Sequence, residues 1–140
     1  MQTVTPYLLY EDCEAALDFL ARAFGFEEVL RYTGEGGYIN HAEMKVGPGG
    51  RIFMGDPGGD YKSPKRLGQD SVGIYVEVDD DVDARCERAR EAGATIREEP
   101  TDQEYGERRF TAKDPEGHVW YFARRIAEVA PEEWGAKVAS

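Results

Sequence analysis

Cysteine and histidine are both scarce in this sequence, whose 140 residues include two of each. Two cysteines, Cys13 and Cys86, do not make a disulfide framework. The chain also lacks a C-x-x-C pair, a Walker loop, a G-x-S-x-G elbow and a His-Glu-x-x-His helix. The sequence therefore lacks the common signatures of redox thiols, nucleotide-phosphate loops, hydrolase serines and zinc proteases.

Long apolar runs and an excess of basic residues are also missing. No apolar stretch approaches the roughly 20 residues that a membrane helix needs, and no basic region followed by an apolar one opens the chain. The formal charge is -11, so the field around the molecule repels nucleic-acid phosphates and anionic lipids. We therefore expect a cytoplasmic protein with no nucleic acid and no membrane partner. Cationic or neutral ligands are favoured, although an acidic surface also serves solubility alone.

The first half of the chain predicts a strand, a helix and three more strands. A β-prone run at 5–10 is followed by Asp12, which is placed to cap a helix over 13–24. Apolar residues recur there at helical spacing, and Gly25 is placed to end the helix. Three strand-like runs follow, at residues 27–32, 38–46 and 51–55.

The same order repeats in the second half. A segment at 56–70, rich in proline and glycine, is a linker or a lid between the halves. After a strand at 73–78, Asp80 is predicted to cap a second helix that Gly93 ends, with strands at 95–98, 108–113 and 118–123 and a loop at 99–106. The two halves are offset by 68 residues early and 67 residues late, which places Tyr7 on Tyr75 and Phe53 on Trp120. An internal repeat of this kind predicts a fold made of two similar units.

These patterns predict a single α+β domain over residues 1–140. Unit one covers about 3–56, the linker 57–70, unit two about 71–125, and a tail helix lies within 126–140. Pro131 suits the first turn of that helix, and Trp134 is expected to dock on the body.

Two stretches of this repeat resemble a known family. The run Asp-Pro-Glu-Gly-His-Val-Trp-Tyr-Phe at 114–122 and the opening Pro-Tyr-Leu-Leu-Tyr-Glu-Asp at 6–12 are similar to the vicinal oxygen chelate superfamily. That family includes glyoxalase I, bleomycin resistance proteins and extradiol dioxygenases, and the bleomycin-resistance branch is the most similar. Over residues 3–125, the resemblance implies two tandem βαβββ units that form a curved eight-stranded mixed sheet with helices outside and a central cleft. It also implies a homodimer, because many relatives build the cleft from two chains.

Enzymes of this family place four metal ligands in the cleft, and the resemblance assigns those positions here to Thr5, Met54, Gly73 and Tyr121. None of the four offers the imidazole nitrogen or carboxylate oxygen that a divalent metal prefers. The resemblance therefore implies no metal and no other cofactor. His41 and Glu43 alternate on one strand and share a face, so an off-pattern metal site or an acid-base pair stays open there.

Strand alternation predicts which side chains face the cleft. Phe53 and Trp120 are expected to pack on the helices. The cleft face is expected to carry Tyr7, His41, Glu43, Met54, Tyr75, Glu77 and Tyr121. Tyrosine rings stack on planar groups and attract cations, and a carboxylate adds a charge-assisted hydrogen bond to a bound amine.

Three functions remain open on this evidence. The leading one is a non-catalytic protein that binds or sequesters a small molecule, with a tyrosine-rich acidic cleft for a planar, preferably cationic ligand. The alternative is a metal-dependent lyase, isomerase or dioxygenase of the glyoxalase type, with an off-pattern site around His41 and Glu43. The third is a structural or regulatory dimer with no small ligand.

Overall fold

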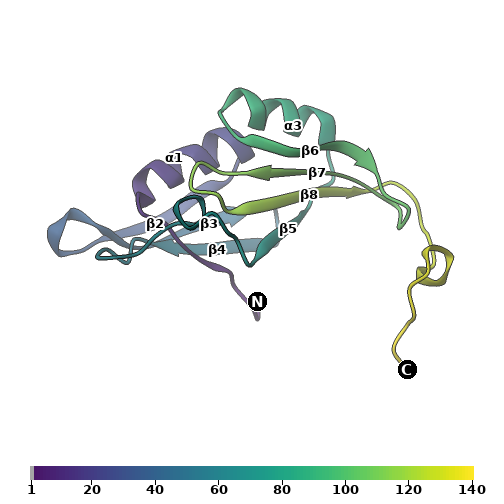
Figure 1. Ribbon diagram of the computed structural model, residues 1–140, viewed down its shortest axis with the longest axis horizontal. Coiled ribbons are helices and arrows are strands. Elements are labelled where there is room, and N and C mark those ends of the chain that lie inside the picture. The colour runs from purple at the N-terminus through teal and green to yellow at the C-terminus, as the bar shows by residue number, and fades with distance from the viewer. Residues whose placement is uncertain (1) are drawn as a thin grey trace.

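The computed structural model describes residues 2–140 and contains two consecutive units of one design (Figure 1). The strands and helices of unit one are β1 (Tyr7–Leu9), α1 (Cys13–Phe24), β2 (Glu27–Thr33), η1 (Glu35–Gly37), β3 (Ile39–Val46) and β4 (Gly50–Gly55). Those of unit two are β5 (Gly73–Glu77), α3 (Val82–Glu91), β6 (Thr95–Asp102), β7 (Glu107–Lys113) and β8 (Val119–Arg125). A short helix, α2 (Pro64–Leu67), lies between the units, and a 3₁₀ turn, η2 (Pro131–Trp134), lies in the tail.

Each unit forms one four-stranded mixed sheet. The strand orders are β1-β4-β3-β2 and β5-β8-β7-β6, so the second sheet repeats the topology of the first. In both sheets the first strand of the unit runs parallel to the last, and the remaining neighbours are antiparallel. The predicted α+β fold of tandem βαβββ units is confirmed, with its eight strands divided between two sheets.

Helix α1 forms where its apolar stripe and caps predict it. The Asp12 side chain accepts a hydrogen bond from the Ala15 amide at 3.0 Å, and Gly25 ends the helix at a φ of 75°. The predicted cap of the second helix is wrong by one residue. Asp81, not Asp80, accepts from the Ala84 amide, because α3 begins at Val82. The Asp80 carboxylate instead pairs with Arg85.

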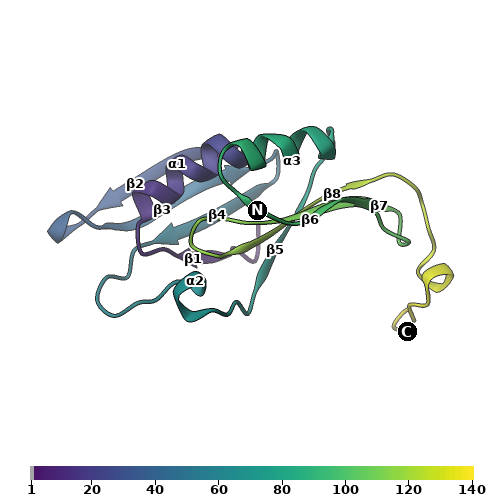
Figure 2. The same cartoon turned by 45° about the horizontal axis from the view of Figure 1, so that its top comes forward.

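One hydrophobic core spans both units. Helices α1 and α3 lie next to each other on the same side of the sheets (Figure 2) and pack together. Phe24, at the end of α1, contacts Trp120 and Phe122 of β8 at ring-centroid distances of 5.5 and 4.7 Å. The two units therefore share one interior rather than folding around separate cores.

The turn before β8 connects unit two to unit one. The buried Asp114 carboxylate accepts hydrogen bonds from the Tyr10 hydroxyl at 2.7 Å and from Trp120 Nε1 at 3.1 Å. The Glu116 carboxylate accepts from the backbone amides of Glu11 and Asp12, just before α1. The turn that carries the family resemblance is therefore also the joint between the units.

Two segments depart from the sequence prediction. The expected loop at 99–106 is strand over its first four residues, because β6 continues to Asp102, where Arg108 of β7 pairs with the Asp102 carboxylate. The tail extends away from the body (Figure 1), and Trp134 contacts Tyr105 of the β6–β7 hairpin at 5.8 Å between ring centroids. No helix in residues 2–140 combines the length and the apolar character that crossing a membrane requires.

Candidate functional site

The face of the first sheet that points away from α1 carries three close rings. Tyr7 of β1 lies opposite Phe53 of β4 in the sheet register. The ring centroids are 6.0 Å apart for Tyr7 and Phe53, 5.1 Å for His41 and Phe53, and 5.6 Å for Tyr7 and His41. Tyr7 is 49% exposed, so this face, called here the first open face, presents aromatic surface to solvent.

A chain of hydrogen bonds joins three strands of the first open face. The Tyr7 hydroxyl lies 3.0 Å from Nδ1 of His41, and Nε2 of His41 lies 2.9 Å from Oε2 of Glu43. Arg51 donates from Nη1 to the other Glu43 oxygen at 3.0 Å. The structure therefore brings together Tyr7, His41 and Glu43, three of the predicted site residues.

The second sheet presents a matching face, called here the second open face. Tyr75 of β5 lies opposite Tyr121 of β8, and their rings stack at 5.7 Å. The Tyr75 hydroxyl donates to Glu107 at 2.6 Å, and the Arg109 guanidinium lies 5.3 Å from the centroid of the Tyr121 ring. Burial raises the pKa of Tyr75, and the hydrogen bond to Glu107 raises it further.

The prediction that Met54 faces the cleft is wrong. Met54 is fully buried, lies opposite Leu8, and belongs to the core that packs on the helices, whereas Phe53 is on the open face. The error comes from the assumed offset of 67 residues. The register equates Phe53 with Tyr121, so the offset stays at 68 as it does for Tyr7 and Tyr75.

The predicted site residues form two clusters rather than one. Tyr7 lies with His41 and Glu43 on the first open face, and Tyr75 lies with Tyr121 on the second. Within residues 2–140, no hydrogen bond or ring contact joins the two clusters. Glu77 is exposed at the end of β5, opposite Ala123.

Four side chains of these faces were not predicted: Arg51, Tyr105, Glu107 and Arg109. Arg109 donates to Tyr105 at 2.8 Å and to Glu98 at 3.0 Å, so it holds its place over Tyr121 through fixed contacts. The sequence could have identified Arg109 as a site residue, because Arg109 stands 68 residues after His41. The constant offset would have placed both residues at the same position of their units.

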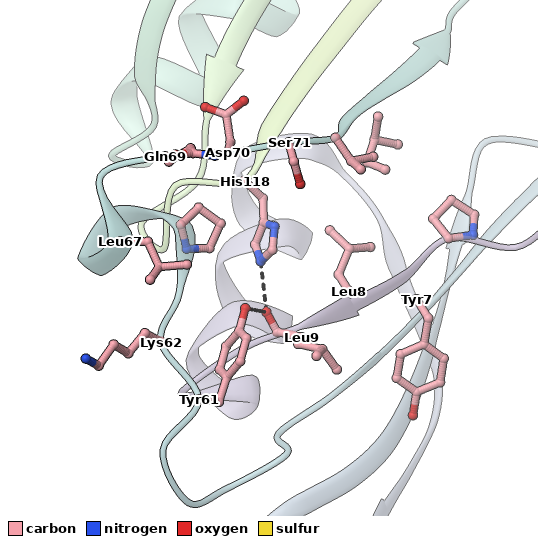
Figure 3. A pocket seen from close by; sticks show the side chains of 14 residues that line it. Tyr7, Leu8, Leu9, Tyr61, Lys62, Leu67, Gln69, Asp70, Ser71 and His118 are labelled. Atoms are coloured by element: carbon pink, nitrogen blue, oxygen red, sulfur yellow. Dashed lines mark hydrogen bonds between the residues drawn. The ribbon is translucent and has the colours of Figure 1, made fainter.

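A cleft of about 640 Å³ lies between β1, the linker and the start of β5 (Figure 3). His118 Nε2 and the Tyr61 hydroxyl both donate to the Leu9 carbonyl, at 2.8 and 2.9 Å. These two bonds attach the linker and the residue before β8 to the end of β1. Tyr7 and Leu9 line the same cleft, so it borders the first open face.

The linker at this cleft is held by Glu11, whose carboxylate accepts hydrogen bonds from the Ser63 amide and from Arg66. Those bonds lower the pKa of Glu11 from 4.5 to about 2. Because the folded pKa is depressed, this contribution to stability is complete above the unfolded value and is lost as the pH falls through the window from 4.5 to 2.

We therefore expect the linker amides of residues 61–63 and 65–68 to lose protection in hydrogen exchange as the pH is lowered from about 5 to 3. Glu11→Gln should show the low-pH linker behaviour already at pH 7. Rates should be corrected for intrinsic exchange at each pH, with strand β7 as the internal reference. Equal linker protection in the variant and the wild type at pH 7 would contradict the assignment.

The donors on the open faces do not fit a divalent metal. With the corrected register, the four family ligand positions are Thr5, Phe53, Gly73 and Tyr121. His41 and Glu43 are bonded to each other, and Arg51 takes the remaining Glu43 oxygen. Across residues 2–140, the one group of three potential ligands is Cys86, Glu87 and Glu99. Arg90 contacts all three of those side chains, so a cation already lies among them.

Comparison with known proteins gives relatives along nearly the whole chain. An uncharacterized protein of Mycobacterium bovis is 34% identical over 142 residues, which cover 98% of this chain and 92% of that one. The crystal structure of TioX from Micromonospora sp. ML1 has a TM-score of 0.72 at 33% identity, covering 90% of this chain and 100% of TioX. A glyoxalase/bleomycin resistance protein/dioxygenase structure from Nocardioides has a TM-score of 0.69 at 20% identity, covering 99% and 91%. That likeness concerns the fold alone.

The family comparison agrees with the structural one. The model described as the Glyoxalase/Bleomycin resistance protein/Dioxygenase superfamily matches residues 3–122, which include both units and the turn before β8. The chain belongs to the Glyoxalase/Bleomycin resistance protein/Dioxygenase superfamily.

Proposed function

We propose that this protein binds or sequesters a planar, cationic small molecule in the cytoplasm, in the manner of the bleomycin resistance proteins of its superfamily. The observation that carries the proposal is the pair of aromatic clusters at equivalent positions of the two units. Tyr7 and Tyr75 are 49% and 44% exposed, and each hydroxyl is held by a hydrogen bond. Rings held in this way offer flat surface to a ligand at little further cost in conformational entropy.

The acidic partner of the ligand is expected at Glu107. This side chain is 6% exposed, accepts a hydrogen bond from Tyr75, and forms no ion pair with a basic side chain in residues 2–140. A buried carboxylate without a cationic partner favours a bound cation. The face of Tyr121 is already covered by Arg109, so the cationic group is expected beside Tyr75 and Glu107 rather than over Tyr121.

We propose further that the binding unit is a homodimer. The open faces of both sheets leave large apolar side chains in solvent, including Tyr7, Leu9, Tyr32 and Tyr75. A second copy that set the first open face of one chain against the second open face of its partner would cover both and enclose a ligand between them.

Isothermal titration with proflavine, a planar cation, tests the proposal, with fluorescein as a planar anion of similar size. We expect proflavine to bind and fluorescein not to bind. A hydrogen bond to a charged group contributes about 1.5–3 kcal/mol. Since tenfold in affinity is about 1.4 kcal/mol, Glu107→Gln should weaken proflavine binding by about 10- to 100-fold.

The matched control is Glu91→Gln, which removes the same charge from the exposed end of α3. It should leave the affinity for proflavine within about twofold of the wild type, since exposed charges at a distance are screened. Equal binding of the cation and the anion, or equal losses in the two variants, would overturn the proposal.

A further inference from the structure

The Glu43 carboxylate determines which groups donate and which accept in the row of hydrogen bonds on the first open face. An ionised carboxylate only accepts, and both Glu43 oxygens have partners, so His41 Nε2 must carry a proton and donate to Glu43. In neutral His41 the other nitrogen, Nδ1, therefore holds a lone pair. That lone pair lies 3.0 Å from the Tyr7 hydroxyl, nearer than the Asn40 carbonyl oxygen at 3.4 Å, so the phenol donates to the imidazole.

We propose that Tyr7, His41 and Glu43 form a nucleophile, a base and a positioning residue, and that Tyr7 accepts acyl groups from activated aryl esters. A nucleophile bonded to a base, which a third group orients, is the arrangement that activates hydroxyl groups in acyl transfer. Here Arg51 also fixes the carboxylate at 3.0 Å. The inference goes beyond ligand binding and does not depend on the proposed cationic ligand.

The step needs no further reactant. The Tyr7 oxygen forms a bond to the ester carbonyl carbon while the phenolic proton moves to Nδ1 of His41. The bond from that carbon to the aryl oxygen breaks, and its electron pair leaves with the aryl oxide. His41 then returns its proton to the aryl oxide, which leaves acylated Tyr7, a free phenol and the original neutral imidazole.

Access and shape favour small aromatic esters at this position. In the single chain Tyr7 is 49% exposed, and its ring lies beside those of Phe53 and His41, on which an aryl leaving group can stack. Gly55 allows the backbone to approach closely here, because a methyl group there would lie 2.5 Å from the Asn40 carbonyl oxygen and 3.2 Å from the Tyr7 oxygen. The net charge of -11 favours uncharged esters over anionic acyl carriers.

Two other exposed tyrosines of the same chain serve as internal controls for the role of His41. Tyr75 occupies the equivalent position of unit two with a similar exposure of 44%, but its hydroxyl donates to the Glu107 carboxylate instead of an imidazole. Tyr38 is 53% exposed and lies outside both clusters. Exposure alone therefore predicts equal acylation of the three tyrosines, whereas the proposed base predicts selective acylation of Tyr7.

The test treats the full chain with para-nitrophenyl acetate and follows both the release of para-nitrophenolate and the acetylated residue, identified by peptide mass spectrometry. We expect a burst of one equivalent, with acetyl on Tyr7 formed about 100-fold faster than on Tyr75 or Tyr38, the usual gain from a positioned base. Tyr7→Phe should abolish the burst, and Tyr38→Phe should preserve it.

Two further variants separate the roles of His41 and Glu43. His41→Gln should reduce acetylation of Tyr7 to the rate of Tyr38 and give Tyr7 the same dependence of rate on pH as Tyr38. Glu43→Gln should slow acetylation of Tyr7 and change the dependence of its rate on pH, a change that a purely structural role would not produce. Circular dichroism verifies that each variant is folded, and the comparison of tyrosines within the wild type needs no variant.

Two results would overturn the proposal. The first is acetyl spread over lysines and all exposed tyrosines without preference for Tyr7. The second is selective acetylation of Tyr7 at an unchanged rate in folded His41→Gln. Neither result bears on proflavine binding, so the two proposals fail independently.

Discussion

Asp114→Ala is expected to lower the free energy of unfolding by about 3–5 kcal/mol, measured by urea denaturation at pH 7. The carboxylate is 4% exposed and accepts four hydrogen bonds. Two of its donors, the Tyr10 hydroxyl and Trp120 Nε1, belong to side chains that are themselves at most 1% exposed. Alanine would leave both of these donors buried without a partner.

The protonation state of Tyr10 explains why this loss of stability should be large. Burial raises the pKa of Tyr10 well above its ordinary value, and the nearby Asp114 carboxylate raises it further. Tyr10 therefore keeps its proton and donates to Asp114 at pH 7. Leaving one buried donor unsatisfied costs about 1–3 kcal/mol, and Asp114→Ala leaves two.

Two comparison variants sharpen this prediction. Asp60→Ala removes an exposed carboxylate from the linker and should change the stability by no more than about 0.5 kcal/mol. Asp114→Asn should give an intermediate loss, because the amide retains one acceptor oxygen for one pair of donors and turns an NH₂ group toward the other. A loss below about 1 kcal/mol in Asp114→Ala would contradict the central role assigned to this carboxylate.

The fold was predictable from the sequence because local signals and the internal repeat agreed. Asp12, Gly25 and the apolar stripe between them gave the bounds of α1 as observed. Local sequence patterns did not predict the secondary structure correctly where pairing between strands determines it. Residues 99–102 contain Pro100 and three polar residues and so appear loop-like, but β7 supplies Arg108 across the hairpin and keeps them in a strand.

The candidate site was only partly predictable, since it depends on register. The alternation of His41 and Glu43 placed both correctly on one face, because the period of a strand is fixed. Aligning the repeats one residue out of register exchanges Met54 with Phe53. This error places a core residue in the predicted site. The bond between Tyr7 and His41 crosses from β1 to β3 over β4, and no spacing along the chain encodes it.

The turn at 114–117 has a structural role that its family resemblance does not reveal. Its Asp114 binds the end of β1 through Tyr10, its Glu116 carboxylate binds the start of α1, and the Glu116 carbonyl accepts from Lys65 of α2. One short segment thus fixes the first strand, the first helix and the linker. These contacts give the turn a role in folding that does not involve a metal.

Phe24→Ala is expected to lower the free energy of unfolding by about 3–5 kcal/mol and to loosen both units together. The Phe24 ring lies within 5.6 Å of Phe19, Phe26, Trp120 and Phe122, measured between centroids. Phe24→Leu keeps most of the volume and should cost less than about 1.5 kcal/mol. Tyr38→Ala removes a ring that is 53% exposed and should cost much less than Phe24→Ala.

Hydrogen exchange measures whether the loss of stability caused by Phe24→Ala extends from unit one to unit two. Phe24 belongs to unit one, but its Trp120 and Phe122 contacts belong to unit two, and Arg88 of α3 also donates to the carbonyl of Arg22 in α1. If the shared core makes unfolding a single transition, the amides of β3 and β7 should lose protection by the same factor in Phe24→Ala. Loss of protection in β3 alone would show that the units unfold separately. In that case the shared aromatic cluster would be a contact surface between two units rather than one core.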